Sequence, residues 1–77
     1  MTRVFLADSQ TEVRSALRLL LLDMNMKVVG NAADWPTALA QAAGTQPDML
    51  VVDWDLIPTG NSLLELRATC PEAVVIV

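Results

Sequence analysis

Three acidic residues follow apolar runs and could share a site. Asp53 and Asp55 come directly after the β-branched run in VVDWDLIP, and Asp8 ends the run VFLAD. Converging carboxylates repel one another unless one is protonated or a cation lies between them. Carboxylates, a loop carbonyl and water suit Mg²⁺, which often serves phosphoryl chemistry. The pattern therefore indicates a magnesium-dependent phosphoryl site if the fold brings Asp8 and Asp53 together.

A structural interpretation of the same acids competes with this one. Asp often ends a strand because its side chain satisfies the amides of the following turn. For a single Asp the structural interpretation is the better one. For Asp8 and Asp53 together, each at the end of a strand, the functional interpretation is favoured.

Four apolar runs predict the strands that would position these acids. They lie about 20–25 residues apart, which leaves room for one helix and two short loops in each interval. Most are continuous rather than alternating, as is typical of strands covered on both faces of a parallel sheet. The predicted strands are Val4–Ala7, Lys27–Gly30, Met49–Val52 and Ala73–Val77.

The intervals carry helix signals. From Val13 to Met24 apolar residues recur every three or four positions, which predicts a helix with one broad apolar stripe. The segment Ser9–Glu12 has the pattern of a capping box before it. Asp34 can cap a second helix that Gly44 ends. A third, short helix is predicted over Asn61–Thr69.

The alternation of strands and helices predicts an α/β fold with an open parallel sheet of four strands and three helices. Ligands of such sheets bind beyond the carboxyl ends of the strands, where the strand order reverses. With the order 2-1-3-4, Asp8 and Asp53 end neighbouring strands at that point. We expect residues 1–77 to form one incomplete domain, because the chain ends inside its most apolar run.

Three segments together resemble bacterial response-regulator receiver domains, which have a flavodoxin-like fold. RVFLADSQTEVRSALRLLL resembles the first strand and helix, PDMLVVDWDLIP the third strand and its loop, and LLELRATCPEAVVIV the third helix and fourth strand. The resemblance covers the whole chain but only the first part of a receiver, without the last helix–strand–helix portion. It implies a fragment of a two-component response regulator that is not itself an enzyme.

The resemblance also implies roles for individual residues. Asp53 would accept a phosphoryl group from the phosphohistidine of a sensor histidine kinase. Asp8 matches the first acid of the pair that holds Mg²⁺, and Asp55 would lend its backbone carbonyl to the metal. Ser9 stands where the family has the second acid, so Mg²⁺ binding should be weak, because a hydroxyl is a poorer ligand than a carboxylate.

Two further departures affect the expected activity. Pro58 lies five residues after Asp53, where the family has four, so the loop is expected to be rearranged. The family's switch hydroxyl and lysine lie beyond Val77, and without them the transferred group is less stabilised. We therefore expect this chain alone to accept phosphate poorly.

Two other hypotheses stay open. The chain could be a degenerate receiver that acts as an interaction or dimerisation module without phosphoryl transfer. An enzyme using the same edge of the sheet is disfavoured, because the chain has no His and no glycine-rich phosphate loop. We also expect a homodimer or a domain-swapped assembly through the unpaired strand edge at Val74–Val77.

Composition narrows the partners and the compartment. The net charge is −4 and the five basic residues are scattered, so direct nucleic-acid binding by this chain is not expected. One Cys and no His exclude an internal disulfide and the usual zinc sites. No apolar stretch reaches membrane-spanning length. A cytoplasmic location fits best. The hydrophobic fraction of 53% suggests a face that meets a partner or the rest of a larger domain.

Overall fold

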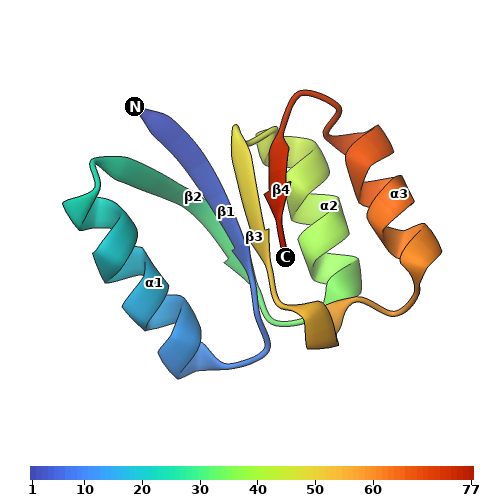
Figure 1. Cartoon of the computed structure of the whole chain (residues 1–77), viewed down its shortest axis with the longest axis horizontal. Coiled ribbons are helices and arrows are strands. Elements are labelled where there is room, and N and C mark those ends of the chain that lie inside the picture. The colour runs from blue at the N-terminus through green and yellow to red at the C-terminus, as the bar shows by residue number, and fades with distance from the viewer.

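The computed structural model describes residues 1–77, which form a parallel sheet of four strands with three α-helices (Figure 1). The elements are β1 (Thr2–Ala7), α1 (Thr11–Asp23), β2 (Met26–Ala32), α2 (Trp35–Thr45), β3 (Met49–Val52), the short 3₁₀ helix η1 (Trp54–Leu56), α3 (Gly60–Thr69) and β4 (Val74–Ile76). The strand order is β2-β1-β3-β4. The predicted fold class and strand order are confirmed. None of the helices is long and apolar enough to cross a membrane.

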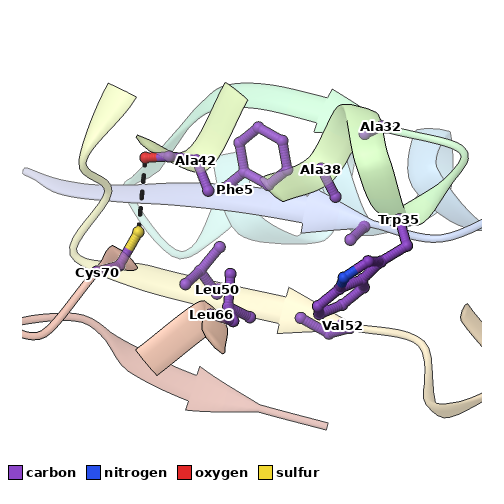
Figure 2. Close-up of a cluster of buried hydrophobic side chains, with 10 residues drawn as sticks. Phe5, Ala32, Trp35, Ala38, Ala42, Leu50, Val52, Leu66 and Cys70 are labelled. Atoms are coloured by element: carbon purple, nitrogen blue, oxygen red, sulfur yellow. Dashed lines mark hydrogen bonds between the residues drawn. The ribbon is translucent and has the colours of Figure 1, made fainter. Parts of the chain in front are cut away.

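The helices divide between the two faces of the sheet. Helix α1 lies alone on one face, and α2 and α3 cover the other (Figure 1). Strand β1 contributes side chains to both faces of the sheet, because successive side chains of a strand point to opposite faces. Phe5 and Ala7 belong to the larger of two cores, under α2 and α3, whereas Val4 and Leu6 pack with Leu21 of α1. The buried residues of the larger core, all but Ala7 labelled in Figure 2, are Phe5, Ala7, Ala32, Trp35, Ala38, Ala42, Leu50, Val52, Leu66 and Cys70. The central strand is therefore buried on both faces, as its continuous apolar sequence predicts.

The pairing of β1 with β2 contains a bulge that makes room for a ring. Val4 pairs with Val28, but Phe5 pairs with Gly30, so Val29 has no partner in the register. A Cβ built on Gly30 would lie 2.8 Å from Cε2 of Phe5. Glycine is needed here for space, because only a residue without a Cβ lets the Phe5 ring lie against this backbone.

Of the three predictions about helix ends, one is confirmed by the structure and two are wrong. Asp34 caps α2, and its Oδ1 accepts a hydrogen bond from the Thr37 N–H at 2.9 Å. The capping box at Ser9 is wrong: Gln10 is the N-cap residue of α1, and no side chain caps it. Gly44 does not end α2, which runs to Thr45 and ends in a left-handed Gln46 with φ of 45°.

The broad apolar stripe predicted for α1 is only partly covered. Leu21 is buried and Leu17 half-buried, but Leu20 is 59% exposed and Met24 63%. No second helix lies beside α1 on its face of the sheet, so only one line of its residues meets the strands (Figure 1). The same face is bare over β4, where Val75 packs into the larger core while its neighbours on the strand are exposed.

Candidate functional site

The central strands bring two of the predicted acids to the same edge of the sheet. The last pair in the β1–β3 register is Ala7 with Val52, and the next residues are Asp8 and Asp53. The Asp53 N–H donates to the Ala7 carbonyl at 2.8 Å, which continues the pairing past the strand ends. Neighbouring strands lie about 4.8 Å apart, so the two acids start one strand spacing from each other. Both are half-buried.

The loop after β3 is shaped by Asp53 itself. Its Oδ1 accepts a hydrogen bond from the Asp55 N–H at 3.3 Å and caps the short helix η1. The carbonyls of Asp53 and Trp54 each accept a bond from the N–H three residues further on. The next carbonyl, on Asp55, has no such donor, because residue 58 is Pro58 and proline has no N–H. The Asp55 carbonyl is therefore available to another partner.

The loop after β1 is held by an arginine that the sequence interpretation did not include. Asp8 Oδ1 accepts a hydrogen bond from the Gln10 N–H at 2.9 Å. Arg14 donates from Nη1 to the Asp8 carbonyl at 2.6 Å and from Nη2 to the Thr11 hydroxyl at 3.3 Å. This role could have been predicted from the position of Arg14 in the sequence, which places it one turn inside the helix that follows the strand before Asp8.

The remaining predicted residues lie apart from the two central acids. Ser9 is exposed and neither caps α1 nor bonds to either acid. Asp55 is exposed, and no group of three or more His, Cys, Asp or Glu side chains lies together in the structure. The edge thus offers two carboxylates, on Asp8 and Asp53, and one free carbonyl, on Asp55, rather than a three-acid cluster.

Two titratable groups outside this pair are perturbed, and each has a structural cause. The hydrogen bond from the Thr37 N–H lowers the pKa of Asp34, as expected for a carboxylate that caps a helix. Burial raises the pKa of the Cys70 thiol, whose Sγ donates to the Ala42 carbonyl at 3.5 Å (Figure 2). Cys70 is the C-cap residue of α3 and is buried in the larger core, and Asp34 serves as a cap.

Comparisons with known proteins agree on the fold. No family model matches the chain. It is 37% identical over 75 residues to protein-glutamate methylesterase/protein-glutamine glutaminase 2 of Cereibacter sphaeroides, a match that covers 96% of the chain but 20% of that protein. The chain therefore spans a minor part of the curated relatives it matches.

Two solved structures are similar to the chain in both fold and amino-acid sequence. A two-component response regulator of the LuxR family from Aurantimonas matches with a TM-score of 0.85 and 28% identity, covering 97% of the chain and 56% of that structure. The response regulator domain of CheB from Thermotoga maritima matches with a TM-score of 0.81 and 27% identity, covering 97% and 57%.

Proposed function

Because the chain has the fold of a response-regulator receiver domain, we propose that it accepts a phosphoryl group on Asp53 from the phosphohistidine of a sensor kinase. The observation that supports this most directly is the β1–β3 pairing. It sets Asp8 and Asp53 side by side at the edge where open parallel sheets bind their ligands. Both residues are half-buried, so part of each is accessible to solvent.

In the proposed reaction a carboxylate oxygen of Asp53 attacks the phosphorus of the phosphohistidine. An O–P bond forms as the N–P bond breaks, and the imidazole nitrogen that leaves takes up a proton. Oδ1 of Asp53 is held by the Asp55 N–H. Oδ2 accepts no hydrogen bond from the protein and is the oxygen that we assign to the attack. The Asp55 N–H would thus fix the rotamer of the nucleophile.

The residues at this edge fit a Mg²⁺ ion. Two carboxylates and the free Asp55 carbonyl are hard oxygen ligands, and Mg²⁺ in proteins keeps several waters and needs few protein ligands. Asp8, Asp53 and the Asp55 carbonyl would hold it. When bound, the ion would neutralise the charge of the carboxylates and of the phosphoryl oxygens. With Ser9 in place of a second acid on the β1 side, we expect the affinity for Mg²⁺ to be low.

Beryllofluoride with Mg²⁺ tests this proposal on the chain as it is. Trp54 follows the acceptor and is 67% exposed, whereas Trp35 is buried in the core. We expect a saturable, Mg²⁺-dependent change in the fluorescence of Trp54, which Trp54→Phe removes.

Two matched variants separate the acceptor from its neighbour. Asp53→Asn should abolish the response. Asp55→Asn should keep it, because the proposed role of Asp55 rests on backbone atoms that the substitution leaves in place. Because we expect the affinity for Mg²⁺ to be low, the titration must be carried to high Mg²⁺ concentration. No response from the wild type even there, or an equal response from Asp53→Asn, would refute phosphoryl acceptance at this residue.

A second candidate function has support of its own. On β4, the edge strand, Val74 is 57% exposed and Ile76 45%. Exposed apolar edges recruit further strands. The chain would then act as a degenerate receiver that forms a homodimer or a domain-swapped assembly through residues 74–77, with no phosphoryl transfer. Sedimentation analysis should show a dimer that Ile76→Lys converts to a monomer, and a folded wild-type monomer would refute this.

The proposed function also implies a location. We propose that the chain acts in the cytoplasm, where it would meet the phosphorylated domain of its sensor kinase. The esterase and glutaminase activities in the name of the Cereibacter relative are not carried over to this chain, which matches 20% of that protein.

A further inference from the structure

A polar groove lies between α1 and the sheet, on the face that α1 covers. Its volume is about 110 Å³. Leu6 and Val28 line its apolar part, and both belong to the sheet under α1. Its polar walls are Thr11, Arg14, Ser15 and Arg18 from α1 and Asn31 from β2. In Figure 1 these two elements lie next to each other at the side of the sheet away from β4.

The charge of this groove is opposite to that of the protein. The chain has nine acidic and five basic residues, yet two of the five line the groove and none of the nine does. Neither guanidinium is neutralised by a carboxylate. Arg14 donates to a backbone carbonyl and a hydroxyl, and the exposed Arg18 makes no hydrogen bond within the protein. The groove therefore holds two uncompensated positive charges.

The polar groups also share one kind of hydrogen bonding. Guanidinium groups only donate, and the hydroxyls of Thr11 and Ser15 and the amide of Asn31 can donate as well. These donors come from both walls of the groove, four residues from α1 and one from β2. A planar carboxylate is satisfied by a single guanidinium, whereas the oxygens of a tetrahedral phosphate can use donors from several directions.

The groove continues into an apolar pocket. Arg18 and Val28 line both spaces, and the second pocket, of about 260 Å³, adds Met1, Leu22 and Met26 together with Lys27. Leu22 is 67% exposed, because nothing in the chain covers it. We propose that the groove binds a small phosphate monoester, with the phosphate between Arg14 and Arg18 and an apolar substituent over Leu22 and Met26. The inference does not depend on phosphoryl transfer to Asp53.

Titration of the full chain with phenyl phosphate, monitored by ¹⁵N–¹H NMR at constant ionic strength, tests the proposed phosphate site. We expect saturable shifts of the Ser15 and Asn31 amides. Arg18→Gln should weaken binding about tenfold, the loss expected for one charge-assisted hydrogen bond. Arg67→Gln, which removes an exposed arginine of α3, is the matched control and should leave binding unchanged.

Two further arms separate the parts of the proposal. Inorganic phosphate should shift the same amides with lower affinity, and Leu22→Ser should weaken phenyl phosphate while leaving inorganic phosphate unaffected. Asp53→Asn should bind phenyl phosphate like the wild type, so failure at Asp53 and failure in the groove are distinguishable. Shifts that do not saturate, that lie only around Asp53, or that are equally weakened by Arg67→Gln would overturn the proposal.

Discussion

Adding one methyl group at Gly30 should destabilise the protein measurably, because the space is already filled by a buried ring. The Cβ of Gly30→Ala would lie 2.8 Å from Cε2 and 2.9 Å from Cδ2 of Phe5, against 3.4–4 Å for an ordinary contact. Because real Cβ contacts are essentially never shorter than 3.0 Å, the ring or the backbone must shift to admit the methyl group. Phe5 is fully buried in the larger core, among the side chains drawn in Figure 2.

The magnitude follows from two opposing effects. Overpacking a core by one methyl group costs about 1–3 kcal/mol. The loss of backbone freedom in the unfolded chain returns about 0.4–1 kcal/mol. We expect the free energy of unfolding to fall by about 1–2 kcal/mol, which for a domain of this size lowers Tm by roughly 5–15 °C.

Urea unfolding followed by far-UV circular dichroism measures this change, and Gly44→Ala is its matched control. A Cβ on Gly44 meets nothing within 4 Å, and within a helix alanine is favoured over glycine by about 1 kcal/mol. The same substitution should therefore stabilise the protein at Gly44. In a Phe5→Leu background, Gly30→Ala should be less destabilising, because the ring atoms are gone. An unchanged stability, or a loss of the same size with and without the ring, would refute the packing argument.

Three further predictions concern the helix ends and the thiol. Asp34→Ala should lower stability. The hydrogen bond from Thr37 lowers the pKa of Asp34 in the folded state, so the stability that Asp34 contributes is present above its unfolded pKa and is lost as the pH falls through its folded pKa. Urea unfolding from about pH 6 to pH 2 should show this loss in the wild type. The Asp34→Asn variant should lack this pH dependence. Asn25→Ala should destabilise by about 1 kcal/mol and Asn25→Gly should not, because residue 25 is left-handed, with φ of 59°; the same urea assay checks both. Cys70 should react slowly with a thiol reagent at mildly alkaline pH, and faster as urea opens the core, because burial raises the pKa of the thiol.

The strands could be predicted because their signal is local. The predicted strand Met49–Val52 has the same bounds in the structure, and the predicted strand Ala73–Val77 is one residue shorter at each end, at Val74–Ile76. The spacing between the apolar runs leaves room for the crossovers of the observed strand order. The convergence of Asp8 and Asp53 follows from that order alone, since each acid comes directly after its strand.

The two errors at helix ends have different causes. Gly44 is a better helix terminator than Gln46, but Arg3 donates to the carbonyls of Thr45 and Gln46 at 2.7 and 2.8 Å and stabilises the end of α2 there. Nothing near Gly44 in the sequence reveals an arginine more than 40 residues away. Ser9 fails as a cap for a local reason, because α1 begins one residue later than a capping box at Ser9 requires and Gln10 is its N-cap residue.

Arg14 contacts both the acidic edge and the groove, whereas Arg18 contacts only the groove, so substitutions of the two arginines separate the two proposed sites. Its guanidinium lines the groove and also holds the Asp8 carbonyl at 2.6 Å. Arg14→Gln removes both contacts, so it should weaken phenyl phosphate binding and also loosen the turn in which the Gln10 N–H bonds to Asp8. Faster hydrogen exchange at Gln10 reports that loosening. Arg18→Gln removes only the groove contact and should leave the exchange rate unchanged. If both variants leave Gln10 equally protected, the bond from Arg14 does not hold the loop that presents Asp8.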